Sequence, residues 1–111
     1  MKDYTITQLT NAVKASFAKY DKQGTNHWTW EVAARDLSYQ IGSLNKVMLQ
    51  ISGDRWADGK EKETLEADFR NELADIIAEV LYIAAERDID MNRAMDEMIA
   101  DDQHKVSKRT K

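Results

Sequence analysis

The chain contains no cysteine and no proline, and only four of its 111 residues are glycine. Without cysteine it cannot form disulfides, thiolate-ligated zinc sites or iron–sulfur clusters, and it has no thiol nucleophile. The lack of cysteine also fits a reducing compartment, so we expect a cytoplasmic protein. Proline and glycine are the residues that most often interrupt helices, and their scarcity therefore favours a helical fold.

Long apolar segments are also missing. No part of the sequence approaches the run of about 20 apolar residues that crosses a bilayer, and the polar start of the chain does not resemble a signal peptide. We therefore expect no membrane partner. A length of 111 residues predicts a single domain over 1–111, with a core of limited size.

A basic face that would suit a nucleic-acid backbone is not apparent. The formal net charge is −4, and residues 1–55 hold seven Lys and Arg against five Asp and Glu, whereas residues 56–111 hold nine against fifteen. We therefore expect no nucleic-acid partner. The one basic cluster is the stretch 104–111, which we interpret as a flexible, solvated tail; contact of its lysines with phosphate is the alternative.

Apolar residues spaced three and four apart predict four helices, at about residues 5–20, 30–51, 62–86 and 91–105. Thr29 and Asp90 occupy N-cap positions before the second and fourth helices. Residues 21–26 and 52–60 are predicted as a turn and a loop, and no segment shows the alternation of a strand. The sequence therefore predicts an all-α fold, a compact bundle of four helices with the third at its centre.

The apolar faces of these helices predict the core. The inward face of the second helix is expected to consist of Ala33, Leu37, Ile41, Leu44, Met48 and Ile51. The inward face of the fourth is expected to consist of Met91, Ala94, Met95, Met98 and Ile99. The third helix is apolar on more than one side, as is typical of a central helix or a subunit interface. We therefore expect a homodimer or homotetramer built on the second and third helices.

Three acidic residues interrupt the third helix at a regular spacing. Glu72, Asp75 and Glu79 lie at i, i+3 and i+7, so that their carboxylates share one stripe. Like charges at this spacing repel one another, and a bound cation such as Mg²⁺, which prefers oxygen ligands, would offset the repulsion. The alternative is a solvated face on a highly charged helix.

The second helix carries a matching polar stripe. Asp36, Gln40 and Ser43 lie at i, i+4 and i+7, and Gly42 stands beside them. Glycine inside a helix costs about 1 kcal/mol relative to alanine. Its presence suggests a close approach by another helix or by a ligand, with simple helix packing as the less specific explanation.

Three segments together resemble the MazG-like, all-α nucleoside triphosphate pyrophosphohydrolases. They are NELADIIAEVLY at 71–82, LSYQIGSL at 37–44 and IDMNRA at 89–94, within a resemblance that covers about residues 30–109. The family carries an E-x-x-D pair, which Glu72 and Asp75 match. It also carries an E-x-x-E pair on the preceding helix, where this sequence has Gln40 and Ser43.

The resemblance implies a four-helix MazG-like fold that hydrolyses an NTP or dNTP to NMP and pyrophosphate with Mg²⁺, or with Mn²⁺. Glu72 and Asp75 would be the catalytic metal ligands. The full set expected to support the metal is Glu72, Asp75, Glu79, Gln40 and Asp36. Asp102 and Lys105 fall where the family contacts phosphate.

The two neutral residues leave two functions open. Gln40 and Ser43 weaken the metal site, and Asp36 lies one turn, about 5.4 Å, before Gln40. The chain is then either a pyrophosphohydrolase of reduced activity or a catalytically degenerate relative. Such a relative would bind nucleotide or act as an oligomeric interaction module.

Three tryptophans complete the candidate residues. Trp28 and Trp30 bracket the Thr29 cap and are expected to pack against the helices, with stacking on a nucleobase as the alternative. Trp56, in the loop before the third helix, is expected to be exposed, as a lid or interface residue.

Overall fold

The computed structural model describes residues 1–22 and 28–109, which form four α-helices and no strand. The helices are α1 (Ile6–Lys22), α2 (Trp30–Ser52), α3 (Lys62–Glu86) and α4 (Met91–Arg109). The predicted all-α class is confirmed, and the bounds of α1 to α3 agree with the predicted ones to within two residues. Of the turn predicted at 21–26, the first two residues belong to α1, which continues through Lys22. Residues 23–27 lie outside the described residues.

Side-chain caps set several of the helix ends. The Thr29 hydroxyl accepts a hydrogen bond from the Val32 N–H (3.3 Å), and Asp90 Oδ1 accepts from the N–H groups of Asn92 (3.0 Å) and Arg93 (3.2 Å). Gly53, at φ 85°, ends α2 in the left-handed conformation that glycine adopts without a steric penalty. These caps lie within a few residues of the ends that they fix, which explains why the bounds follow from the sequence.

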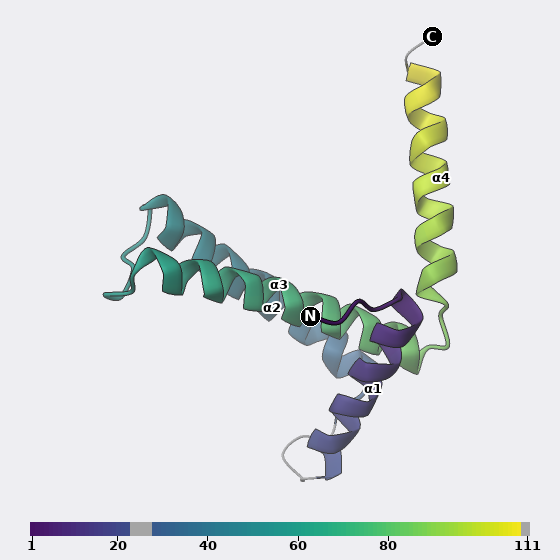
Figure 1. Cartoon of the computed structure of the whole chain (residues 1–111), viewed down its shortest axis with the longest axis horizontal. Helices are drawn as coiled ribbons and strands as arrows, with labels where there is room; N and C mark the ends of the chain where they lie inside the picture. Colours follow the sequence, from purple (N-terminus) through teal and green to yellow (C-terminus); the bar gives the residue numbers. More distant parts are fainter. Residues whose placement is uncertain (23–27, 110–111) are drawn as a thin grey trace.

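The helices do not form the compact four-helix bundle that the sequence predicted. α2 and α3 form an antiparallel hairpin, α1 packs on α3, and α4 points away from the hairpin (Figure 1). The radius of gyration is 17.4 Å, against about 13 Å for a compact chain of this length. α3 is nevertheless the central helix, as expected, since it contacts both α1 and α2.

The core of the chain is correspondingly small. Its buried apolar side chains are Ala33, Val47, Leu65, Leu81, Tyr82 and Ala84. The predicted inward face of α2 is partly wrong, because Ile41 is 45% and Met48 48% exposed. α2 instead meets α3 through a stripe displaced by one residue, which buries Val47 and Gln50.

α4 also differs from its prediction. None of its residues is buried, and Met98 and Ile99 of its expected inward face are 44% and 48% exposed. Residues 104–109, predicted as a flexible tail, continue the helix to Arg109. Among the described helices, none has the length and apolar character of a membrane-spanning segment.

A buried glutamine holds the tip of the hairpin. Gln50 is 4% exposed, and its Nε2 donates to the Trp56 carbonyl (3.2 Å) and to Asp58 Oδ2 (3.1 Å). Lys60 pairs with Asp68 at 2.9 Å, which connects the loop to α3. Trp56 itself is 78% exposed, as the sequence predicted.

The close approach predicted at Gly42 does not occur within the chain. A β-carbon at this position would have no neighbouring atom within 4 Å. The Gly42→Ala substitution is therefore expected to raise the free energy of unfolding by about 0.5–1 kcal/mol, because alanine loses less backbone entropy in a helix. Urea unfolding followed by circular dichroism measures this difference.

The matched control is Gly53→Ala. Gly53 also has open space around it, but its φ of 85° is unfavourable for alanine, so the free energy of unfolding is expected to fall by about 1–2 kcal/mol. A loss of stability in Gly42→Ala as well would contradict the prediction and would show that another molecule packs against Gly42 in solution.

Candidate functional site

The contact between α2 and α3 is polar along its middle. We call this line of residues the acid seam; its members are Asp36, Gln40 and Ser43 on α2 and Asp68, Glu72, Asp75 and Glu79 on α3. They recur every three or four residues, which keeps them on the facing sides of the two helices. All seven are partly or fully buried. The structure therefore brings together the five predicted metal-site residues, which come from two separate stretches of sequence.

Glu79 is the most constrained residue of the acid seam. Its side chain is 4% exposed, and neither carboxylate oxygen accepts a hydrogen bond from the described residues. Its pKa is raised from about 4.5 to about 8, chiefly by burial and further by interactions with Asp36 and then Asp75. Two carboxylates offer no donor to each other, but a protonated Glu79 could donate to Asp36. An unpaired negative charge at this position is costly.

Glu72, two turns earlier on α3, is also partly buried and also has a raised pKa. Its Oε2 is buried and has no hydrogen-bond partner among the described residues. Burial raises the pKa of Glu72, and the charges of Asp75 and Asp68 raise it further. The neighbouring carboxylates of α3 thus make Glu72 harder to ionise.

The α2 side of the acid seam is better satisfied. Gln40 Nε2 donates a hydrogen bond to Asp36 Oδ2 at 3.3 Å. On α3, Asn71 Nδ2 lies 3.5 Å from Asp75 Oδ2, at the limit of a hydrogen bond. The Gln40 amide, at a position where the family resemblance implies an acidic residue, therefore serves as an internal donor to Asp36, the one carboxylate of the seam on α2.

The acid seam has the type of oxygen ligand that a hard divalent cation binds, but its side chains are not arranged around a single ion. Glu72 and Glu79 provide buried oxygens without partners, the ligand type that Mg²⁺ takes. Within residues 1–22 and 28–109, however, no three acidic or histidine side chains converge closely enough to hold one ion. Without a counter-ion, like charges are expected to keep their side chains apart. To bind a cation, these side chains would have to rotate toward one another.

A pocket with two lysines adjoins the hairpin-tip end of the acid seam. It has a volume of about 230 Å³, and its lining includes Ser43, Asp68 and Glu72 together with Lys46 and Lys60. Lys46 and Lys60 remain close to half exposed while they lie near Asp58 and Asp68. Neither lysine is recognisable in the sequence as part of the site, because only the folded hairpin brings the loop residue Lys60 beside α2.

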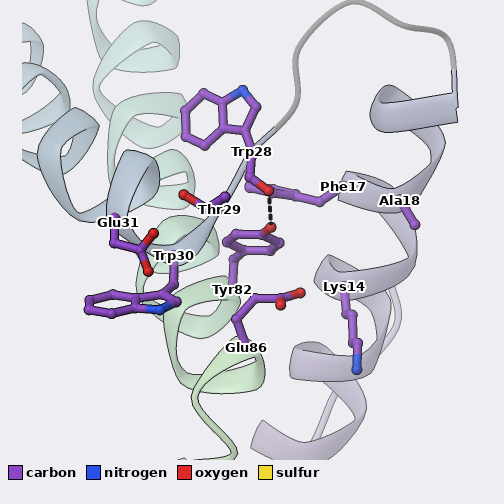
Figure 2. A pocket seen from close by; sticks show the side chains of 9 residues that line it. All are labelled: Lys14, Phe17, Ala18, Trp28, Thr29, Trp30, Glu31, Tyr82 and Glu86. Atoms are coloured by element: carbon purple, nitrogen blue, oxygen red, sulfur yellow. Dashed lines mark hydrogen bonds between the residues drawn. The ribbon is translucent and has the colours of Figure 1, made fainter.

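A larger, aromatic pocket of about 450 Å³ lies at the other end (Figure 2). Tyr82, one turn beyond Glu79, stacks on Phe17 of α1 with ring centroids 4.4 Å apart, and its hydroxyl donates to the Trp28 carbonyl at 2.9 Å. Trp28 meets Phe17 edge to face at 6.0 Å. Trp28 thus packs as predicted, while it also lines an open pocket.

Charged groups surround this aromatic pocket. Glu31, Glu86 and Lys14 contribute to its lining, and Figure 2 shows the Glu86 side chain extending from α3 toward α1. The Arg87 guanidinium lies 4.7 Å from the centre of the Trp30 ring, a cation–π contact. The Trp30 ring at this pocket is thus in contact with a cationic side chain.

The two predicted phosphate contacts lie elsewhere. Lys105 and Asp102 are exposed on the outer half of α4, which points away from the hairpin (Figure 1). Lys105 pairs with Asp101 at 2.9 Å. In this arrangement a single chain does not bring them to the acid seam, and their role stays a prediction.

We compared the chain with models of protein families, with characterised proteins and with solved structures, and none of the three comparisons gave a match. The resemblance to the MazG-like enzymes therefore rests on the sequence motifs alone.

The raised pKa of Glu79 predicts how stability depends on pH. In the unfolded chain this carboxyl ionises near pH 4.5, and in the folded chain near pH 8. Stability without divalent cations should therefore fall as the pH rises between these values, by a total on the order of 1–3 kcal/mol. Chemical unfolding in the presence of a chelator at pH 5.5, 7 and 8.5 measures the effect.

The Glu79→Gln variant removes the ionisation and keeps the shape of the side chain. It is expected to flatten the fall in stability and to make the protein more stable than the wild type at pH 8.5. Glu63→Gln, an exposed position in the first turn of α3, is the control and should follow the wild type. An equal pH dependence in the wild type and Glu79→Gln would contradict the assignment.

Proposed function

We propose that the acid seam binds a divalent cation and that the protein is a MazG-like hydrolase that converts an NTP or dNTP to NMP and pyrophosphate. The observation that carries the proposal is a set of buried carboxylate oxygens between α2 and α3, both of Glu79 and Oε2 of Glu72, that have no hydrogen-bond partner among the described residues. A folded protein rarely retains such groups without a ligand or a catalytic use for them.

A cation would remove the electrostatic cost that the seam now carries. Glu72 and Asp75 would hold Mg²⁺ or Mn²⁺, with Glu79 as a third carboxylate and Asp36 and Gln40 supporting from α2. Such an ion acidifies a bound water and neutralises phosphate oxygens. Since a positive charge favours the ionised form of a carboxylate, binding would also lower the pKa of Glu79.

The pockets at the two ends of the acid seam suit the two ends of a nucleotide. Lys46 and Lys60 offer positive charge at one end, where phosphate oxygens would find partners. Trp28, Trp30 and Tyr82 offer aromatic surface at the other, where a base can stack. The cation site would then lie at the phosphates, between the two pockets.

The reaction is hydrolysis of the bond between the α- and β-phosphates. A water attacks phosphorus and gives up a proton, and the phosphoanhydride P–O bond breaks to release pyrophosphate from the nucleoside monophosphate. A carboxylate of the seam would accept that proton as the general base.

A second function, nucleotide binding without turnover, is favoured by the α2 side of the seam. Gln40 and Ser43 are neutral, and the only carboxylate of this side, Asp36, already accepts a hydrogen bond from Gln40. The seam then has fewer carboxylates than two divalent ions would need to balance their charge. The protein would be a catalytically degenerate relative of the MazG-like enzymes that binds nucleotide or acts as an interaction module.

Activity is tested by a panel of NTPs and dNTPs with Mg²⁺ or Mn²⁺ and detection of pyrophosphate. The wild type is expected to release pyrophosphate and monophosphate in equal amounts. Glu72→Gln should lose at least 100-fold in kcat/KM, because one ligand charge disappears. Glu63→Gln, with the same chemical change outside the seam, should retain the wild-type rate. Equal rates in wild type and Glu72→Gln would mean that the activity is a contaminant.

Calorimetry then distinguishes the two functions. Cation-dependent nucleotide binding without pyrophosphate release supports the degenerate, nucleotide-binding relative. The absence of both metal and nucleotide binding contradicts the hydrolase and the nucleotide-binding relative, and leaves the interaction module. In Gln40→Glu, an added charge beside Asp36 should destabilise the metal-free protein and tighten Mn²⁺ binding about tenfold or more. Unchanged Mn²⁺ affinity would place the cation elsewhere.

A further inference from the structure

The pocket of about 230 Å³ at the hairpin-tip end of the acid seam, which we call the lysine pocket, is lined by Lys46, Lys60 and the buried Gln50 among others. We propose that Gln50 is a positioning residue for phosphate binding there: it holds the loop between α2 and α3 so that both ammonium groups face the same pocket. This inference rests on the proposed function, which places the phosphates of a nucleotide in this pocket.

The side chain of Gln50 is committed to the loop. Gln50 lies in the last turn of α2 and is 4% exposed. Its Nε2 donates to the Trp56 carbonyl at 3.2 Å and to Asp58 Oδ2 at 3.1 Å, which uses both hydrogens of the amide. An apolar side chain of the same size would fill the space without the cost of burying a polar group. The loop contacts, rather than packing, therefore explain why an amide stands here.

The hydrogen bond to Asp58 supports a turn that needs support. Asp58 has a φ of 56°, and Gly59 follows at 76°. Positive φ is uncommon for residues other than glycine, although aspartate tolerates it better than most. The Lys60 N–H donates to the Ala57 carbonyl at 3.0 Å and closes the turn. By fixing the Asp58 side chain, Gln50 favours the conformation from which Lys60 leaves the loop.

The positions of both ammonium groups are linked to this turn. Lys46 Nζ lies 4.0 Å from Asp58 Oδ2, the oxygen that accepts from Gln50. Lys60 Nζ reaches Asp68 Oδ2 on α3 at 2.9 Å. The contact of Lys46 is too long for a hydrogen bond, and an ammonium group has three N–H donors, of which Lys60 gives one to Asp68. Both lysines therefore retain donors for phosphate oxygens.

Formal charge alone does not make the lysine pocket attractive to phosphate. Its lining contains the ammonium groups of Lys46 and Lys60 and the carboxyl groups of Asp68 and Glu72. In a site with balanced charges, the attraction of an anion depends on which groups lie nearest to it. Phosphate affinity therefore depends on where the two ammonium groups are held. A loop that Gln50 fixes before binding also loses less conformational freedom when the phosphate arrives.

The variant Gln50→Met tests the proposal, because methionine has nearly the same length and lacks the N–H donors. Gln103→Met, the same change at an exposed position of α4, is the matched control. Calorimetry with inorganic tripolyphosphate and Mg²⁺ is expected to show about tenfold weaker binding in Gln50→Met at unchanged stoichiometry, and wild-type binding in Gln103→Met. Nucleotide hydrolysis by Gln50→Met is expected to show a rise of about tenfold in KM with kcat within about twofold of the wild type.

A purely structural role of Gln50 predicts a different result. If Gln50 only kept the hairpin folded, Gln50→Met would contain less competent protein, so the binding stoichiometry and kcat would fall while the affinity and KM stayed unchanged. That result would overturn the proposal, as would wild-type values throughout. Failure of the wild type to bind tripolyphosphate would overturn it as well. The release of pyrophosphate from nucleotides, measured separately, shows in each case whether the proposed hydrolase function survives.

The variant Asp58→Asn separates the hydrogen bond from the charge. Asparagine keeps an oxygen that accepts from Gln50 and tolerates positive φ, but it removes the negative charge beside Lys46. Asp58→Asn is expected to bind tripolyphosphate at least as tightly as the wild type, and to lose about tenfold in affinity when combined with Gln50→Met. A loss of about tenfold in Asp58→Asn alone would show that the charge of Asp58 orients Lys46 without Gln50, and would overturn the assignment.

Discussion

The pairing of α2 with α3 through charged side chains is the constraint on which the rest of the structure depends. An antiparallel helix pair ordinarily buries apolar residues along its contact, yet here Asp36, Glu72 and Glu79 occupy that position. Buried carboxylates oppose the association that apolar contacts at both ends of the seam favour. The arrangement is therefore one that a positive ligand would stabilise, and the seam is the part of the molecule best suited to chemistry.

This use of the helix contact also explains where the apolar residues lie. Since the facing sides of α2 and α3 hold the acid seam, the large aliphatic side chains occupy the adjacent sides and remain exposed. The single chain consequently has a small core and an extended outline. The acid seam and the exposed aliphatic residues lie on adjacent sides of the same two helices, so a change that tilts either helix would alter both.

Local signals made much of this predictable. Thr29 and Asp90 mark helix starts through caps that involve only adjacent residues, and the i, i+3, i+7 spacing placed the acids of α3 on one stripe. The register between helices was not predictable. On α2 the aliphatic stripe and the polar stripe are both regular and one residue apart, and apolar periodicity favoured the wrong one as the inward face. The proximity of Lys46 and Lys60 was not predictable either, because it depends on how the loop between α2 and α3 folds.

The attachment of α4 has a consequence for the dynamics of the chain. α4 follows Asp88, whose φ is 54°, and buries none of its residues, while the hairpin tip is held by Gln50. Backbone hydrogen bonds of a helix with an exposed surface open by local fraying, without unfolding of the remainder. Amide hydrogens of α4 in an isolated chain would then exchange with solvent well before those of α2 and α3, and the two parts would behave as separate cooperative units.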